Sequence, residues 1–241
     1  AIPDQIDIEK IHEEVYKEVQ DAYYTQEPFT IHPEEDGIDF DISLDEAKAM
    51  LAEDKTEYEI PLKIIPAEIT LYNIGLEAFP YEISTFSTRY DVTNVNRSIN
   101  LKLAADKIDG VVLMPGEVFS YNQVVGKRTI EAGYKNAAIY VNGGVEDGLG
   151  GGICQISSTL YNAVLLANLG IVERENHTFV TSYVKPGRDA TVVYGSIDFK
   201  FENTRNYPIK FETSVENGVA TISIHGIAEE TEYEVRILPV I

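Results

Sequence analysis

Residues 150–168 read GGGICQISSTLYNAVLLAN, three glycines followed by a segment that is apolar on nearly every side. Its apolar positions, among them Ile156, Leu160, Val164 and Leu165, recur at helical spacing, which predicts a helix over 155–168. A helix that is apolar all round is buried rather than amphipathic. The stretch therefore predicts a buried helix at the centre of the fold, with Cys154 at its first turn.

The flanking sequence predicts a sheet against which this helix can pack. Residues 94–108 have helical apolar spacing, and residues 111–114 read as a short strand that stops at Pro115-Gly116. Alternation over 197–201 and 209–211 predicts strands, and the Asn217-Gly218 turn leads into another at 220–224. Residues 126–152 are rich in Gly and Asn and are expected to be mostly loop. The expected fold is α+β, with the Cys-bearing helix packed on an antiparallel sheet.

The distribution of charge predicts two domains. Residues 1–80 carry 21 acidic and 5 basic side chains, whereas residues 81–241 carry 19 and 14. In the first segment we expect a helix over 6–19, a helix after an N-cap at Ser43, and a strand within 57–65. The boundary is placed near Pro80. The first domain, 1–80, is then a small acidic α+β unit, and the second is 81–241.

Composition excludes several classes of function. The 241 residues include 40 acidic and 19 basic side chains, and the net charge of −21 repels phosphate backbones and anionic lipid. No stretch approaches the roughly 20 apolar residues of a membrane span. The chain begins at Ala1 without a leader, so we expect an export signal or membrane anchor to be missing from view. One cysteine excludes disulfides within the chain.

Cys154 is the first candidate for chemistry. A thiol at a helix N-terminus lies beside free amides and the positive end of the helix dipole, which favour the thiolate. The glycines would let a substrate carbonyl approach closely, and the amides from Gly152 to Gln155 could form an oxyanion hole. The competing interpretation, a buried structural cysteine, stays open.

His177 is the natural base for such a thiol, since His12 and His32 lie in the acidic segment and His225 ends a strand. A dinucleotide loop is disfavoured because Ile153 stands where the third glycine belongs. The sequence has no HxxxH or CxxC spacing around these residues, so we expect neither a metal nor a cofactor.

Several motifs occur together in the second segment: Asn96-Arg97, PGEVFSYN at 115–122, Gly133-Tyr134, GGGICQISST at 150–159, Arg174-x-x-His177, and YVKPGRDA at 183–190. In this order they resemble the VanW family, over about residues 85–225. The stretches PEEDG at 33–37, DISLDEA at 41–47 and IPAEIT at 65–70 give residues 28–80 a weaker resemblance to a peptidoglycan-binding-like domain, and residues 1–27 could be the tail of an earlier copy.

The resemblance implies a cell-surface protein of a Gram-positive bacterium that acts on peptidoglycan. Some members are linked to L,D-transpeptidation, which crosslinks two stem peptides through diaminopimelate residues. Cys154 would then be the acyl-enzyme nucleophile and His177 its base, with Asp189 or Ser182 orienting the imidazole. The implied partners are peptidoglycan stem peptides, with no nucleic acid, and a membrane only through an anchor outside this chain.

Further residues are candidates for holding the substrate. An arginine fork suits carboxylates, so Arg97, Arg128 and Arg174 are candidate substrate-binding residues, with surface ion pairs as the alternative. Tyr121, Tyr134 and Tyr183 could line a cleft or simply pack in the core. Two other functions remain open: a Cys carboxypeptidase that uses water as acceptor, and a non-catalytic wall-binding module.

Overall fold

The computed structural model describes residues 6–26, 29–53, 55, 57–141 and 144–238. The chain divides into two compact units, residues 1–74 and 75–241. The boundary predicted near Pro80 lies a few residues later. The candidate site residues, from Arg97 to Asp189, all belong to the second unit.

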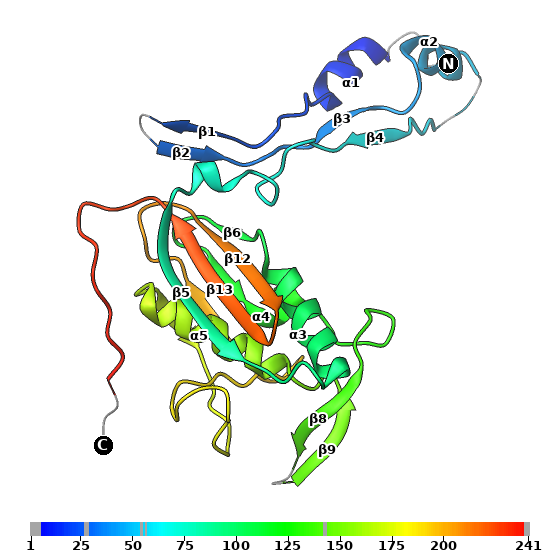
Figure 1. Cartoon of the computed structure of the whole chain (residues 1–241). Coiled ribbons are helices and arrows are strands. Elements are labelled where there is room, and N and C mark those ends of the chain that lie inside the picture. The colour runs from blue at the N-terminus through cyan, green and yellow to red at the C-terminus, as the bar shows by residue number, and fades with distance from the viewer. Residues whose placement is uncertain (1–5, 27–28, 54, 56, 142–143, 239–241) are drawn as a thin grey trace. The chain divides into compact units, whose positions relative to one another are not determined.

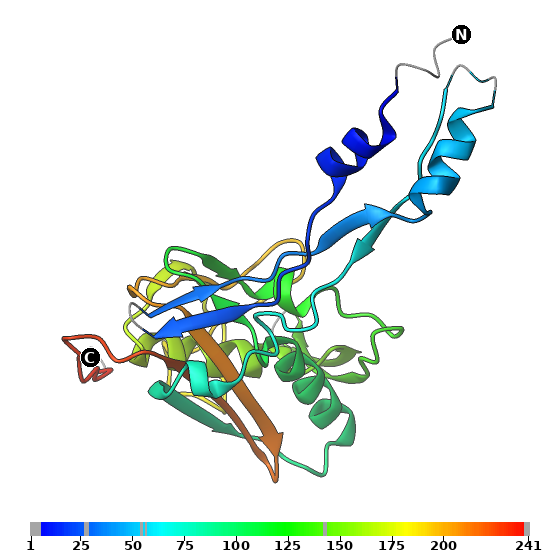
Figure 2. The ribbon, with the colours of Figure 1, turned by 90° about the horizontal axis from the view of Figure 1, so that it is seen from above.

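Among its described residues, the first unit has two short helices and two antiparallel pairs of strands. In Figures 1 and 2 the helices lie at the end of the unit opposite the β1–β2 hairpin. Ser43 is the N-cap of α2 as predicted, and it forms a reciprocal capping box with Glu46. The elements are α1 (Ile8–Val15), β1 (Tyr23–Gln26), β2 (Phe29–His32), β3 (Gly37–Phe40), α2 (Leu44–Leu51) and β4 (Leu62–Ile65). Strand β1 pairs with β2, and β3 pairs with β4.

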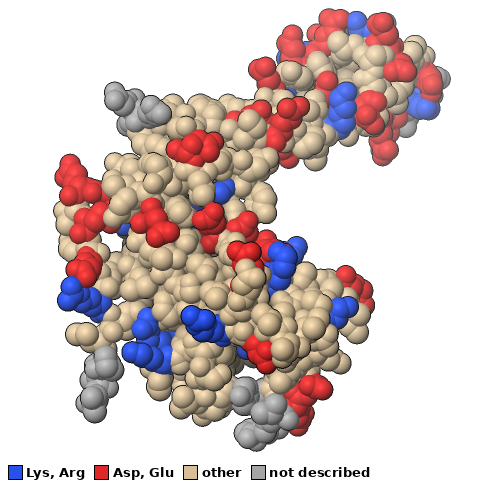
Figure 3. All heavy atoms as spheres, viewed as in Figure 1, with Lys and Arg blue, Asp and Glu red and all other residues tan. Residues whose placement is uncertain are grey.

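Residues 6–26 are an integral part of this unit. Ile8 of α1 packs in a small core with Phe40 and two α2 residues, Ala47 and Leu51. Lys17 forms a bridge with Ile38 of β3. The acidic side chains of the first unit lie on its surface (Figure 3), as the charge count predicts. The described part of the segment 1–27 thus completes this unit's own core and sheet.

The second unit is built around a four-stranded antiparallel sheet in the order β5-β13-β12-β6 (Figure 1). A three-stranded sheet, β10-β11-β7, and the hairpin β8–β9 complete it. Its elements are η2 (Leu76–Ala78), β5 (Tyr81–Arg89), α3 (Val95–Ile108), β6 (Val112–Leu113), β7 (Val118–Ser120), α4 (Tyr121–Val125), β8 (Asn136–Val141), β9 (Gly144–Leu149), α5 (Ile153–Leu166), β10 (Gly170–Glu173), β11 (Lys200–Glu202), β12 (Ile209–Glu216) and β13 (Val219–Gly226).

Helix α5 is the buried helix that the sequence predicts. It packs on β5 and β13, while α3 packs on β12 and against α5. Ile156, Leu160 and Val164 are fully buried and join the strand residues Ile222 and Ile224 in one apolar core. The α+β fold, with the Cys-bearing helix on an antiparallel sheet, is confirmed.

The prediction of a loop over 126–152 is wrong in its second half. Strands β8 and β9 form an antiparallel hairpin that pairs Asn136 with Leu149 and Ile139 with Glu146. Glycine within a strand weakens it but does not prevent pairing, and a Gly-Gly pair between two extended runs is itself a hairpin signal. Gly143 of that pair lies outside the described residues.

Candidate active site

Cys154 is the second residue of α5 and opens onto a cavity of about 470 Å³. The N-cap of α5 is Gly152, whose φ of 110° lies in the left-handed region that favours glycine. We call this space the Cys154 cavity. Its lining is Arg97, Lys127, Arg128, Ala138, Ile139, Leu149, Gly150, Gly152, Ile153, Cys154, Gln155, His177, Phe179, Tyr183, Thr191, Val192, Val193 and Tyr194.

His177 lines the same cavity and is held by Asp189. Its Nδ1 lies 2.6 Å from Oδ2 of Asp189, and its backbone amide donates to the same oxygen at 2.6 Å. Burial by itself raises the pKa of Asp189, but the hydrogen bonds from His177 outweigh it and hold that pKa below its usual value. An ionised Asp189 accepts from Nδ1–H, which leaves Nε2 of the ring as the basic nitrogen. Asp189, rather than Ser182, is therefore the group that orients His177.

Arg174 fixes Asp189 from the other side. Its Nε donates to the Asp189 carbonyl at 2.7 Å, and its Nη2 donates to Oδ1 at 3.2 Å. Its guanidinium carbon also lies 5.1 Å from the centre of the Tyr161 ring of α5. Arg174 does not line the Cys154 cavity, and its contacts hold Asp189 in place.

Burial disfavours the thiolate form of Cys154. Burial raises the pKa of Cys154 and outweighs the opposing effect of the nearby Arg128 and Arg97 charges. Its Sγ donates to the Val192 carbonyl at 3.6 Å, and no hydrogen bond among the described residues joins it to His177. Burial thus opposes the effect of the helix N-terminus, which was expected to favour the thiolate.

The amides at the start of α5 differ in their availability. The Gln155 amide donates to the Gly152 carbonyl at 2.8 Å, and the Ile153 amide donates to Gly150 at 3.3 Å. Within the described part of the chain, the amides of Gly152 and Cys154 have no acceptor. Of the two amides predicted for an oxyanion hole, that of Gln155 is already engaged, whereas that of Gly152 is available.

The side chain of Gln155 instead anchors Arg97. It is buried, and its Nε2 donates to Thr88 Oγ1 at 3.1 Å and to the Arg89 carbonyl at 2.9 Å. Its Oε1 accepts from Nη2 of Arg97 at 2.8 Å. Arg97, from the first turn of α3, is thus held in the wall of the cavity beside Gly152.

A polar face of α5, which the sequence analysis missed, positions the segment that carries Asp189. Ser158 Oγ accepts from the Ala190 amide at 2.9 Å. Asn162 donates to the Arg188 carbonyl at 2.7 Å and accepts from its Nε at 2.6 Å. Cys154, Ser158 and Asn162 are spaced by four, so they lie along one side of the helix. That spacing of polar residues in an apolar helix was the available signal.

The tyrosines predicted for the cleft have different locations. Tyr183 lines the cavity, and burial raises its pKa so that its hydroxyl stays neutral. Tyr134 and Tyr121 are buried in the apolar core instead of the cavity wall. Of the tyrosines predicted to bind substrate, Tyr183 lines the cavity and Tyr134 lies outside its lining.

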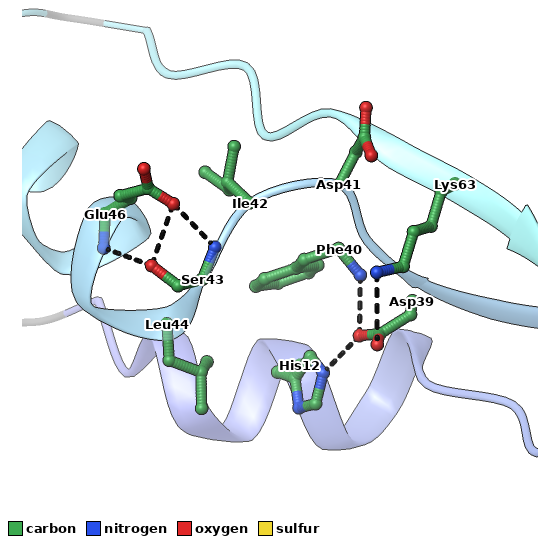
Figure 4. A pocket seen from close by; sticks show the side chains of 9 residues that line it. All are labelled: His12, Asp39, Phe40, Asp41, Ile42, Ser43, Leu44, Glu46 and Lys63. Atoms are coloured by element: carbon green, nitrogen blue, oxygen red, sulfur yellow. Dashed lines mark hydrogen bonds and ion pairs between the residues drawn. The ribbon is translucent and has the colours of Figure 1, made fainter.

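Another cavity, of about 490 Å³, lies in the first unit, and several of its lining side chains are paired with one another (Figure 4). His12 Nε2 lies 2.8 Å from Oδ1 of Asp39, and Lys63 Nζ lies 3.9 Å from Oδ2. Ser43 Oγ is used in the helix cap with Glu46. These contacts explain the cavity as part of the unit's structure rather than as a reactive centre.

No three His, Cys, Asp or Glu side chains of the described ranges are grouped so as to hold a metal ion. Within those ranges, every helix is too short or too polar to cross a membrane.

Comparisons with known proteins match the unit that holds the site. Uncharacterized protein YoaR of Bacillus subtilis (strain 168) is 44% identical over 170 residues, which are 68% of this chain and 56% of YoaR. Vancomycin B-type resistance protein VanW of Enterococcus faecalis (strain ATCC 700802 / V583) is 31% identical over 154 residues, 61% of this chain and 51% of that protein. The chain spans about half the length of these curated relatives.

No solved structure matches the chain significantly. The family model described as VanW like protein matches residues 96–225, more than half of the chain. That range includes Cys154, His177, Asp189 and the whole lining of the Cys154 cavity. The chain therefore belongs to the VanW family.

Proposed function

We propose that this protein acts on the bacterial cell wall outside the cytoplasm, as a cysteine-dependent L,D-transpeptidase of peptidoglycan stem peptides. The observation that carries the proposal is that Cys154 and His177 line one cavity while Asp189 holds the imidazole by two hydrogen bonds. The name of the Enterococcus faecalis relative refers to vancomycin resistance. The family resemblance implies a role in the crosslinking of stem peptides.

In the first step the thiol becomes an acyl carrier. Nε2 of His177 takes the proton from Cys154, whose Sγ attacks the carbonyl that precedes the terminal D-Ala of a donor tetrapeptide. The C–N bond breaks, His177 returns the proton to the leaving amine, and D-Ala departs. The acyl group is left as a thioester. The amides of Gly152 and Cys154 supply hydrogen bonds to the oxyanion that forms in between.

In the second step the acceptor takes over the acyl group. The side-chain amine of a diaminopimelate residue in a second stem attacks the thioester carbonyl, and His177 accepts its proton. The C–S bond breaks, an amide crosslink forms, and Cys154 regains its proton. With water in place of the amine the same thioester would be hydrolysed, which is the carboxypeptidase reaction.

The test is incubation with a disaccharide-tetrapeptide, followed by mass spectrometry of the intact protein and of the products. We expect a thioester adduct and crosslinked dimers, both absent from Cys154→Ala. An adduct with only shortened stems would replace the proposal with a carboxypeptidase. If neither a thioester adduct nor a product is detected, the remaining function is that of a non-catalytic wall-binding module.

Binding of the first unit to peptidoglycan is a separate part of the proposal. Residues 1–74 form a compact acidic unit with its own core, in keeping with a domain that docks or spaces the catalytic unit. Sedimentation of the protein with purified sacculi, with and without this unit's surface charges neutralised, tests that role.

A further inference from the structure

We propose that the Cys154 cavity recognises a free carboxylate of the donor peptide next to the scissile bond, bound between Arg97, Arg128 and Lys127. The inference rests on the proposed function, whose substrate it narrows. It differs from the sequence expectation in the residues involved, since Arg174 leaves the set and Lys127 joins it.

The charge of the cavity is opposite to that of the chain. The chain carries twice as many acidic as basic side chains, yet the lining contains three cations and no Asp or Glu. A cavity lined by one sign of charge with apolar walls concentrates ligands of the other sign. Anionic peptide ends are therefore attracted to this cavity from an otherwise repelling surface.

None of the three cations forms a close ion pair within the described residues, although the charge of Lys127 also contributes to lowering the pKa of Glu131. Arg97, Lys127 and Arg128 form no salt bridge with any residue that the structure describes. Arg174, which serves a structural purpose, is by contrast paired with Asp189. Charges left unpaired in a wall of the cavity are available to a ligand.

The two arginines are held before any ligand arrives. Arg97 donates to Gln155 Oε1, and Arg128 Nη1 donates to Asn122 Oδ1 at 2.8 Å and to the Gly126 carbonyl at 3.0 Å. All three acceptors are neutral, so they orient the guanidinium groups without cancelling their charge. Nη2 of Arg128 is buried and has no acceptor among the described residues. Because that atom has no accessible surface, a carboxylate in the cavity would reach it only after the guanidinium shifts.

The position of Arg97 relates this charge to the reacting bond. A Cβ built on Gly152 would lie 3.2 Å from Nη1 of Arg97, so the guanidinium adjoins the amides that receive the oxyanion. A carboxylate held there lies within about one residue of the scissile carbonyl. In a tetrapeptide donor two groups satisfy this: the carboxylate of the departing D-Ala, and the side-chain carboxylate of the diaminopimelate residue.

Equilibrium binding to the Cys154→Ala protein tests the inference without turnover. The probes are the free tetrapeptide, its C-terminal amide, and the tetrapeptide amidated on the diaminopimelate side chain. We expect one of the two amides to bind about ten- to a hundred-fold more weakly than the free acid, as loss of a charge-assisted hydrogen bond entails. The weaker amide identifies which carboxylate is read.

Matched variants connect that loss to the cavity. Arg97→Gln and Lys127→Gln should weaken binding of the free tetrapeptide. They should hardly change binding of the weaker-binding amide, because amidation of the peptide and replacement of the cation remove the same contact. Lys102→Gln removes a charge from the same helix, α3, where it pairs with Asp106. It should leave every affinity unchanged. Arg97→Lys, which keeps the charge, should restore part of the discrimination.

Equal affinity for all three peptides, or no binding of any of them, would overturn the inference. A wild-type protein that forms crosslinks equally well from the amides would overturn it while leaving the proposed function intact. Arg97-dependent binding of the free acid to Cys154→Ala, with no thioester formed by the wild type, would support the inference and refute the transpeptidase.

Discussion

Oδ2 of Asp189 receives two hydrogen bonds from one residue, from the backbone amide and from Nδ1 of His177, each at 2.6 Å. The backbone bond fixes where His177 lies, and the ring bond fixes how its imidazole is turned. One carboxylate oxygen thus sets both the position and the tautomer of the proposed base.

Replacement of Asp189 by Asn should impair turnover severely. The amide cannot act as the same anionic acceptor for Nδ1–H, so the ring loses its tautomer and its orientation. We expect kcat for crosslink formation to fall on the order of 10²- to 10⁴-fold, the range for loss of a triad carboxylate. Asp106→Asn, an exposed change on α3, is the control. An unaffected kcat in Asp189→Asn would refute the orienting role.

Asp189 should also make stability depend on pH in acid. Its pKa is lowered in the folded state, so it stabilises the fold above the unfolded value of about 3.9, and this contribution is lost as the pH falls through the folded pKa. The Tm of the wild type minus that of Asp189→Asn should be constant above about pH 5 and shrink below pH 4. A difference independent of pH would contradict this.

Arg174→Met should separate positioning from binding. Loss of its bonds to Asp189 loosens the base, so we expect kcat to drop about ten-fold or more while KM changes little. Arg97→Gln should show the opposite pattern, with the larger effect on KM. Steady-state kinetics on the tetrapeptide measure both. A rise in KM alone for Arg174→Met would return Arg174 to the substrate-binding set.

The reactivity of Cys154 should report its burial. Because burial raises the pKa of the thiol, its alkylation by iodoacetamide should accelerate only at a pH above that needed for a free cysteine, about 8.5. The urea-unfolded protein, in which the same thiol is exposed, is the reference. A midpoint below pH 7 in the folded protein would show that the helix N-terminus outweighs burial.

Gly152→Ala should be more damaging than Gly116→Ala. Both glycines have positive φ, 110° and 80°, so alanine strains the backbone at either position by about 1–2 kcal/mol. Nothing lies within 4 Å of a Cβ at position 116, whereas one at 152 would lie 3.0 Å from Cγ of Arg97. Urea unfolding should show a larger decrease in the free energy of unfolding for Gly152→Ala than for Gly116→Ala. Only Gly152→Ala should also bind the tetrapeptide more weakly.

The sequence predicted the parts of the fold that depend on local patterns. The apolar spacing from Ile156 to Leu166 placed the central helix within two residues, and Ser43 and Asn217-Gly218 marked a cap and a hairpin turn. Local chemistry determines such features, so a single chain reveals them.

Features that depend on packing were not predictable in this way. Hairpin β8–β9 looked like loop because its glycines hid the pairing of residues 136–141 with 144–149. The raised pKa of Cys154 and the engaged amide of Gln155 depend on what the fold places around them. Nothing in the sequence distinguished Arg97 from Arg174. The difference lies in their hydrogen-bond partners, which are Gln155 for Arg97 and Asp189 for Arg174.

The side chain of Asn100 in α3 connects two parts of the cavity wall by hydrogen bonds. Its buried side chain donates to the carbonyls of Lys135 and Gly151 and accepts the Lys135 amide, while the Lys135 carbonyl also accepts the Gly150 amide. One amide group therefore joins the base of the hairpin to the glycine run before Cys154. Hairpin β8–β9 and the start of helix α5 should therefore open and close as a single cooperative unit. The amide hydrogens of Lys135 and Gly150 should then exchange with solvent at one common rate.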